Sequence, residues 1–503
     1  MKHIDKYRLF LGLLISLPLL YIAVLYFSRQ EKRTEPNFPP SYLSSSEYCK
    51  DKKSKRLEFA SKDIQELQIA LNSLQECTTI FLKPGVFEFN NSLSIASVNG
   101  ISLQGSGKNA TTIRFVNAGN GNGVDVEASN SFTIRDLKIL DSPKNGLEIR
   151  LSENILIDNI IVTWSNTSGE AMSKNGAYGV YPVNVVNVLL QNTETYYASD
   201  AGLYVGQCIN ALVRNNLAEY NVMGLEIENT VNADVYNNIV RNNTGGFLAY
   251  DLNKNTIVSR NIKVHNNTII NNNFPNFSSA GIVKTVPSGT GIILTSLREA
   301  EIFNNKIGGN HSVDIAIMNG LVSETPDFSA WPMNNWRVHN IYIHDNEFLG
   351  GSGTAVDNGN TDEKNRPLGV LVDMVHEAYN KYLESQNKPK ENLANILYDG
   401  VDTGFTILMM TTWFGNNPGN HNEICIKNNT KGKILPTLLD LNLPALLANA
   451  EEPTKESIAS AIELGDTRVY LPNSDSPYGG SPSRGFDCEG FVATGLPISF
   501  PEK

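Results

Sequence analysis

The triplet Ile134-Arg135-Asp136 decides the fold, because its pattern of an apolar residue, a variable residue and Asn or Asp recurs along the chain. The further copies are Ile157-Asp158-Asn159, Leu190-Gln191-Asn192, Val213-Arg214-Asn215, Val235-Tyr236-Asn237, Val264-His265-Asn266, Ile302-Phe303-Asn304 and Ile343-His344-Asp345. Their last residues are 23, 33, 23, 22, 29, 38 and 41 positions apart. A basic period of 22–23 residues with longer intervals is typical of a solenoid.

Within each period apolar residues alternate with polar ones, as half-buried strands require, and no helical period intervenes. Three short strands use about 22 residues, so each period predicts one turn of a parallel β-helix. The Asn or Asp that closes each triplet is expected at a bend of the coil. There its side chain can bond to the equivalent residue above and below and satisfy backbone groups that no strand pairs.

A second signature is a glycine that precedes an alternating strand in each coil. These glycines are Gly123, Gly146, Gly179, Gly202, Gly224, Gly246 and Gly291. We expect each to adopt a positive φ at a corner of the coil. In the strand that follows, apolar residues face inward and the residues between them face outward, which builds one continuous sheet face along the column.

The N-terminus carries an apolar run, residues 9–27, after Lys2, Lys6 and Arg8. Its nineteen uncharged residues come close to the roughly 20 that cross a bilayer. The run lacks a small-residue cleavage site, which favours an uncleaved transmembrane anchor over a cleaved signal; both imply export. The expected divisions are 1–28 anchor, 29–56 polar tether, 57–98 N-terminal cap, 99–350 β-helix, and 351–503 helical insertion, last coil and C-terminal cap.

The net charge of −11 excludes nucleic acid as a plausible partner. Five cysteines in an exported chain indicate two disulfides and one free thiol. Cys49–Cys77 and Cys425–Cys488 would each close one end of the column, and Cys208 is expected to be buried in a coil.

The apolar spacing over residues 61–75 predicts a helix, with Ser61 as a candidate cap, that covers the N-terminal end of the solenoid. A second helical segment is expected at residues 368–397. Insertions at 164–177 and 274–290 precede the glycine-led strand, and others at 253–260 and 322–337 follow it. Loops on both flanks of one sheet face predict a groove with walls, although surface loops tolerate insertion anywhere.

Tyrosines and carboxylates occupy the outward positions of this face. In chain order they are Asp125 and Glu127, Glu148 and Arg150, Tyr181, Asp200 with Tyr204, Glu226 and Glu228, and Tyr250 with Asp251. Sugar rings stack on aromatic faces, and their hydroxyls bond to carboxylates. The carboxylates can act as acid and base in glycosidic cleavage, or hold a Ca²⁺ ion that binds a uronate. The plain alternative is a ladder of solvated polar residues.

The chain resembles the bacterial right-handed parallel β-helix repeat proteins of the carbohydrate-binding and sugar-hydrolase type. The resemblance rests on Asn175-Gly176-Ala177-Tyr178-Gly179-Val180-Tyr181-Pro182-Val183, Ser199-Asp200-Ala201-Gly202-Leu203-Tyr204-Val205-Gly206-Gln207, Gly224-Leu225-Glu226-Ile227-Glu228-Asn229, Asn243-Thr244-Gly245-Gly246 and Tyr250-Asp251-Leu252-Asn253. It covers about residues 63–346 and implies an all-β, right-handed fold and an exported protein. The Gly-His-Gly pattern of polygalacturonases and the Asp-Pro-His-Glu pattern of alginate epimerases are absent from the sequence.

The leading hypothesis is an envelope protein, anchored in the membrane with its β-helix outside the cytoplasm, that binds and cleaves or epimerises a polysaccharide. Candidate catalytic residues are Asp200, Glu226, Glu228 and Asp251; candidate substrate-binding residues are Tyr178, Tyr181, Tyr204, Gln207, Asn229 and Tyr250. The cofactor is undetermined, with Ca²⁺ a candidate. The alternatives are a non-enzymatic envelope scaffold and, more weakly, a protein that delivers a metal ion.

Overall fold

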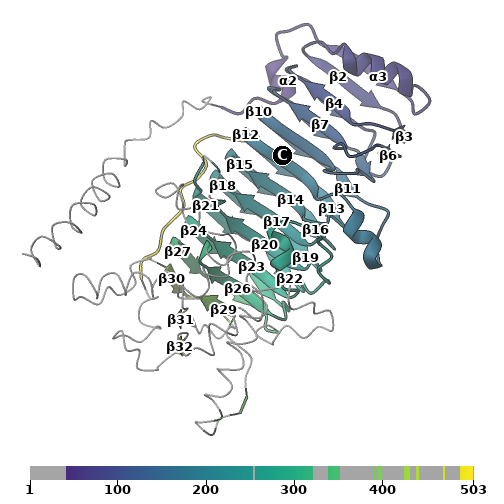
Figure 1. Ribbon diagram of the computed structural model, residues 1–503. Helices are drawn as coiled ribbons and strands as arrows, with labels where there is room; N and C mark the ends of the chain where they lie inside the picture. The colour runs from purple at the N-terminus through teal and green to yellow at the C-terminus, as the bar shows by residue number, and fades with distance from the viewer. Residues whose placement is uncertain are drawn as a thin grey trace, which may run out of the picture.

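The computed structural model describes residues 41–252, 255, 257–320, 338–351, 384, 387, 389–390, 395–398, 424–430, 438–440, 468–470 and 488–501. These residues form a column of stacked coils (Figure 1). Each complete coil contributes one strand to each of three parallel strand series, which we call faces 1, 2 and 3. The predicted all-β solenoid is therefore confirmed.

Face 1 consists of β4 (Leu93–Ala96), β7 (Val124–Glu127), the first halves of β10 (Leu147–Asp158) and β12 (Tyr178–Gln191), β14 (Ala201–Gly206), β17 (Met223–Glu228), β20 (Gly245–Tyr250), β23 (Thr290–Thr295), β26 (Val313–Met318) and β29 (Ile396–Tyr398). Face 2 consists of β1 (Lys55–Phe59), β2 (Thr78–Leu82), β5 (Ser102–Gln104), β8 (Thr133–Arg135), the second halves of β10 and β12, β15 (Ile209–Arg214), β18 (Val231–Tyr236), β21 (Arg260–His265), β24 (Arg298–Phe303), β27 (His339–His344) and β30 (Ile424–Lys427).

Face 3 consists of β3 (Gly85–Phe89), β6 (Thr111–Phe115), β9 (Lys138–Leu140), β11 (Ile161–Thr163), β13 (Glu194–Tyr196), β16 (Leu217–Glu219), β19 (Ile239–Arg241), β22 (Thr268–Ile270), β25 (Lys306–Gly308) and β28 (Glu347–Phe348). Outside the column, β31 (Leu438–Asp440) pairs antiparallel with β32 (Arg468–Tyr470). The described helices are α2 (Ser45–Tyr48), α3 (Ile64–Asn72) and the 3₁₀ turns η1 (Gly169–Lys174) and η2 (Ile282–Thr285).

The core is a continuous apolar stack along the inside of the column. Leu203 of β14 lies in register with Leu225 of β17, and Val205 lies in register with Ile227. All four side chains are buried. Burying one such side chain contributes about 1.5–3 kcal/mol relative to leaving it exposed, so each coil is stabilised mainly by its neighbours.

Asparagine ladders hold the bends, but they are one residue further along the chain than the triplets suggest. The last residues of the eight triplets adopt left-handed φ values of 52–60°. At Asn215 this turns the side chain to solvent, whereas the next residue, Asn216, is buried. The Nδ2 group of Asn216 donates to Oδ1 of Asn238 at 2.9 Å, and the series continues through Asn267, Asn305, Asn346 and Asn429.

Two further ladders stabilise the other bends in the same way. One runs through Asn221, Asn243, Asn272 and Asn310, and the other runs through Asn154, Asn187, Asn210, Asn232 and Asn261. These amides also donate to or accept from backbone groups at the bends. Polar groups buried at the bends are thereby satisfied, which a dry core requires.

The reason predicted for the repeated glycines, a positive φ at each corner, was wrong. None of the seven has a positive φ in this structure. An added Cβ at Gly179 would instead lie 2.4 Å from the carbonyl oxygen of Gly202 in the next coil, and one at Gly246 would lie 2.5 Å from the carbonyl oxygen of Gly291. Glycine is needed here because the backbones of successive coils approach closely before each face 1 strand.

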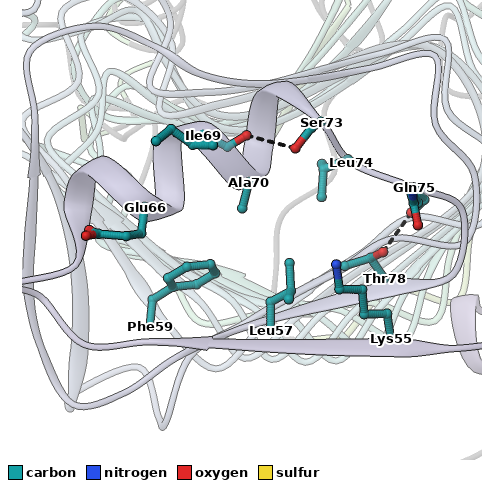
Figure 2. A pocket seen from close by; sticks show the side chains of 10 residues that line it. All are labelled: Lys55, Leu57, Phe59, Glu66, Ile69, Ala70, Ser73, Leu74, Gln75 and Thr78. Atoms are coloured by element: carbon teal, nitrogen blue, oxygen red, sulfur yellow. Dashed lines mark hydrogen bonds between the residues drawn. The ribbon is translucent and has the colours of Figure 1, made fainter.

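The N-terminal end is capped by α3, whose Leu67 is buried against the first coil. Ser61 was expected to cap this helix, but the N-cap residue is Asp63, and its side chain makes no capping bond. Figure 2 shows the cleft of about 260 Å³ between α3 and β1, lined by Leu57, Phe59 and Leu74 among others. The outer strand β1 pairs only with β2 among the described strands, and its exposed Lys55 and Arg56 suit an open edge.

Both predicted disulfides are present, at opposite ends of the column. Cys49 is bonded to Cys77 and Cys425 to Cys488, while Cys208 is a buried free thiol as expected. From Cys488 the C-terminal segment returns along the coils (Figure 1). The backbone of Ala493 donates to Glu301 at 2.9 Å, and Arg214 donates to the carbonyl oxygen of Pro501 at 2.9 Å. This segment is therefore hydrogen-bonded to coils that are far apart in the sequence.

Three sequence predictions fall largely or wholly outside the described residues: the apolar run 9–27, the helix at 368–397 and the insertion at 322–337. Where the chain is described, none of its helices is both long and apolar enough to cross a membrane. The last predicted coil is confirmed by β30, whose partner is β27.

Candidate functional site

The outward side of face 1 changes character along the column. It is charged at β7 and β10, where Asp125, Glu127, Glu148 and Arg150 lie. Tyrosines follow at β12 and β14, and glutamates at β17. Beyond them the outward residues are mainly apolar, and they form a second buried cluster that includes Leu248, Ile293 and Ala316. A polar site therefore borders a covered apolar surface.

Three of the predicted outward carboxylates share one arginine. Arg150 Nη2 lies 2.8 Å from Glu127, and Nη1 lies 3.1 Å from Glu148 and also contacts Asp125. A guanidinium has five N–H donors and can serve several carboxylates at once. This end of face 1 is therefore an ion-pair network, unlike the tyrosine-rich centre of the face.

Three tyrosine rings pack together at the centre of face 1, in a group that we call the tyrosine stack. The rings of Tyr181 and Tyr204 are stacked, and that of Tyr178 is tilted against both. The ring centroids of Tyr178 and Tyr181 are 4.4 Å apart, those of Tyr181 and Tyr204 are 4.4 Å apart, and those of Tyr178 and Tyr204 are 5.0 Å apart. Tyr204 is buried, whereas Tyr178 and Tyr181 are half-buried. The predicted clustering is confirmed, and the two half-buried rings are where the cluster meets solvent.

Gly206 positions the hydroxyl of Tyr204. The Tyr204 ring lies along its own strand over Gly206, where an added Cβ would come within 2.0 Å of the hydroxyl oxygen. This placement lets the hydroxyl donate to Glu228 Oε2 on the next coil at 2.7 Å. Gly206 therefore leaves room for the Tyr204 ring, a role that the alternating pattern of the strand does not predict.

Glu228 accepts hydrogen bonds from several side chains. Besides Tyr204, the Tyr250 hydroxyl lies 2.9 Å from Oε2, and the Asn255 amide donates to Oε1. Several donors directed at one carboxylate favour its ionised form. Asn255 was not among the predicted residues, because it lies in the insertion after β20, where the repeat gives no register.

Glu226 lies on the same strand but in a poorer environment. It is 0% exposed, and its Oε2 lies 3.2 Å from the Tyr250 hydroxyl that Glu228 shares. Its Oε1 has no hydrogen-bond partner among the described residues. Burial raises the pKa of Glu226 well above its ordinary value, and the charges of Asp200 and Glu228 raise it further. Both effects favour the protonated form of Glu226.

Asp200 precedes β14 and faces both glutamates. Its Oδ1 is out of contact with solvent and lacks a partner in the described part of the chain. Burial raises the pKa of Asp200 to about 7, a hydrogen bond from Tyr178 opposes this rise, and the charge of Glu228 adds to it. Among the described residues no lysine, arginine or histidine pairs with Asp200 or Glu226. The three carboxyl groups thus differ in protonation because their surroundings differ.

The predicted open groove floor is wrong, because residues 274–289 cover it. In this cover segment Val283 and Val286 are buried against Met223 and the apolar face 1 residues. An added Cβ at Gly281 would lie 3.0 Å from Asp200 Oδ2, so the segment closes directly over the acids. The apolar outward residues Leu248 and Ile293 were the available signal that something packs on this face.

The remaining predicted site residues have structural roles. Asp251 accepts from the backbone of Ser259 at 3.0 and 3.1 Å and fixes the loop after β20. The Asn229 side chain accepts from the backbone of Leu252 at 2.7 Å and fastens the same loop. Gln207 lies at the bend after β14 with a φ of 51°. The Asn255 amide, which donates to Glu228, also donates to Asn229 Oδ1 at 3.0 Å, so this loop adjoins the carboxyl cluster. A role of the three residues in the site stays a prediction.

The candidate metal ion finds no ready-made site. In the described ranges no three His, Cys, Asp or Glu side chains converge so that they could hold a metal ion. Asp200, Glu226 and Glu228 are neighbours, yet tyrosine hydroxyls lie between the two glutamates. The donor set therefore does not fit a resident Ca²⁺ in this conformation.

Comparison with known proteins identifies the repeat. The family model "Right handed beta helix region" matches residues 99–262 and 164–324. Residues 99–324 are thus a right-handed β-helix region, and the resemblance inferred from the repeats is confirmed. No curated protein matches the chain.

Several solved structures share the architecture. The A-module of the mannuronan C-5 epimerase AlgE6 from Azotobacter vinelandii is 17% identical, over 58% of this chain and 84% of that chain, with a TM-score of 0.38. An exopolygalacturonase from Thermotoga maritima is 12% identical, over 58% and 86%, with a TM-score of 0.37. PfbA, a surface adhesin of Streptococcus pneumoniae, is 11% identical, over 58% and 85%, with a TM-score of 0.35. At such identities the likeness concerns the coiled backbone alone.

Proposed function

We propose that this protein binds a polysaccharide at the tyrosine–carboxylate cluster of face 1 and hydrolyses its glycosidic bonds outside the cytoplasm, held to the membrane by the apolar run 9–27. The observation that carries the proposal is the division between two neighbouring glutamates. Glu228 accepts from two tyrosines and Asn255, whereas Glu226 shares one hydroxyl and keeps an unpartnered, buried oxygen. Carboxyl groups whose surroundings separate their protonation states are what acid–base hydrolysis needs.

In this mechanism each carboxyl group has one role. Glu226 gives its proton to the glycosidic oxygen as the bond from that oxygen to the anomeric carbon breaks. The anionic Glu228 stabilises the positive charge that develops on the sugar ring. Asp200, with a pKa near 7, removes a proton from the water that adds to the anomeric carbon. The tyrosine stack holds the neighbouring sugar by its C–H face.

Substrate entry requires movement of the cover segment, since Glu226 is fully buried beneath it. Gly281 and Gly289 have left-handed φ values of 74° and 91° and mark points where the backbone of this segment turns sharply. The segment holds its own shape, because the Asn276 side chain donates to the carbonyl oxygens of Val283 and Val286 at 2.9 Å.

The test is an activity screen with the full-length protein on neutral, amine-bearing and acidic polysaccharides. New reducing ends without a new double bond would support hydrolysis. An unsaturated product or an inverted C5 centre would replace hydrolysis by elimination or epimerisation at the same cluster. Release of no product from any polymer, together with no binding, would refute the proposal.

A second function is favoured by the burial itself. Tyr204 and Tyr250 bond to glutamates on adjacent coils, so the cluster could serve only to join coils in a non-enzymatic envelope scaffold. On that account Glu228→Gln lowers the melting temperature and no polymer is turned over. The enzymatic account instead expects Glu226→Gln to abolish turnover at an unchanged melting temperature.

A further inference from the structure

The charge of face 1 restricts which sugars can approach the cluster. From β7 to β17 the outward positions and the adjoining corner carry the acids Asp125, Glu127, Glu148, Asp200, Glu226 and Glu228. The base on these strands is Arg150, and three of the acids already share it. An anionic sugar would therefore meet unopposed negative charge, which disfavours it both during approach and in the bound state.

Two buried oxygens need donors that the described chain does not supply. Glu226 Oε1 and Asp200 Oδ1 are sealed from solvent and lack hydrogen-bond partners among the described residues. Both belong to side chains directed at the cluster, and the charge of Asp200 raises the pKa of both Glu226 and Tyr178. A sugar hydroxyl offers one donor, whereas an ammonium group offers three and also carries the opposite charge.

The tyrosines suit the same group. Tyr178, Tyr181 and Tyr204 pack together with centroid separations of 4.4–5.0 Å, and the first two are open to solvent at their edge of the site. The face of a tyrosine ring attracts an ammonium group, and desolvation strengthens the attraction. Aromatic rings beside unpartnered carboxyl oxygens form a complete environment for a cation borne by a sugar.

We propose that the polysaccharide taken at this cluster bears free amino groups, such as a glucosamine polymer, and that uronate polymers are rejected. This inference rests on the proposed function and narrows its substrate class. The ammonium group lies at Asp200 Oδ1, against the tyrosine stack, and supplies the donor that this buried oxygen lacks. Glu226 Oε1 then stays free to give its proton to the glycosidic oxygen.

The experiment is calorimetric titration of the full-length protein, at about 0.15 M salt to screen general attraction. The ligands are a glucosamine oligosaccharide, its N-acetylated counterpart of equal length, and a galacturonate oligosaccharide. Because hydrogen bonds to charged groups contribute about 1.5–3 kcal/mol, the amine should bind at least about tenfold more tightly than the N-acetylated ligand. The galacturonate ligand should not bind.

Two variants separate the site from the overall negative charge of the chain. Asp200→Asn should remove most of the preference for the amine. Glu219→Gln is the matched control, because Glu219 is a buried acid on face 3 that pairs with Arg241. This variant should keep the preference for the amine. Equal loss in both variants would reduce the preference to general attraction and overturn the inference. Galacturonate binding as tight as amine binding would also overturn it while leaving the proposed function intact, whereas binding of no sugar would refute both.

Discussion

Two groups of three carboxyl groups lie on face 1, and they have opposite surroundings. Asp125, Glu127 and Glu148 surround Arg150, which contacts all three. Asp200, Glu226 and Glu228 surround tyrosine hydroxyls, and two of them keep an oxygen without a partner in the described residues. In the first arrangement each acid has an oppositely charged partner, whereas the second carries a desolvation cost that a purely structural face need not bear. This difference is why we propose the functional site at β14 and β17.

The largest effect is expected on turnover when the second group loses its proton donor. Glu226→Gln keeps the size of the side chain and removes the acid. General acid catalysis contributes roughly 10²–10⁴-fold, so turnover should fall by that amount. The melting temperature should hold or rise, because a neutral amide is no more costly to bury here than a carboxyl group. A fall in melting temperature with unaltered turnover would place Glu226 with the structural residues. Glu127→Gln, in the first group, is the matched control.

The Asn ladders supply a sharper structural comparison, because their buried polar groups are satisfied. Asn243 donates to Asn272 and to the backbone of Ala218, and it accepts from Asn221. Asn243→Ala leaves these partners unsatisfied in a dry interior, at about 1–3 kcal/mol for each group. Chemical denaturation should show a loss of stability of this order. Asn242→Gly is the control: this neighbouring residue is half-buried, has a left-handed φ of 55° that glycine tolerates, and makes a side-chain bond to Glu219, so its loss should cost less.

Gly206→Ala should disturb the second group without touching a carboxyl. The added methyl occupies the position of the Tyr204 hydroxyl, and overpacking of this kind costs about 1–3 kcal/mol. The bond from Tyr204 to Glu228 should break, so turnover should fall with stability. Tyr204→Phe on its own removes the hydroxyl without overpacking and should reproduce the loss of turnover alone. If Gly206→Ala keeps full turnover, Tyr204 does not act through Glu228.

The smallest effect is expected in the first group. Arg150→Gln breaks three ion pairs that are partly open to solvent, where each contributes about 0–1 kcal/mol. Thermal unfolding should shift only slightly, and less at high salt than at low salt. A large fall in the melting temperature would show that these three carboxylates are also costly to bury without a partner. The contrast between the two groups would then be contradicted.

The sequence predicted the column and much of the cluster, because both follow from a repeat. A period of 22–23 residues sets which strands lie side by side, and so brought Tyr204, Glu226 and Glu228 together. Burial of the cluster could not be read in this way, since residues 274–289 lie outside the repeat and pack by the shape of their apolar side chains. The same limit hid Asn255, which lies in an insertion. The repeated glycines were found, but the close approach of successive coils that requires them is seen only in the structure. The asparagine ladders were also predicted, but they lie one residue beyond the positions predicted for them.

The most direct measurement concerns Asp200, whose pKa is raised by burial. Its pKa of about 7 in the folded protein exceeds the ordinary value of 3.8. At pH values between these two, Asp200 is therefore protonated in the folded protein and ionised in the unfolded protein. Stability from this group is therefore present below about pH 4 and is lost as pH rises through 7. The unfolding free energy of the wild type, measured from pH 5 to 8, should fall with rising pH relative to that of Asp200→Asn. Parallel curves for the two proteins would mean that Asp200 is ionised like an ordinary surface acid, and would contradict the account.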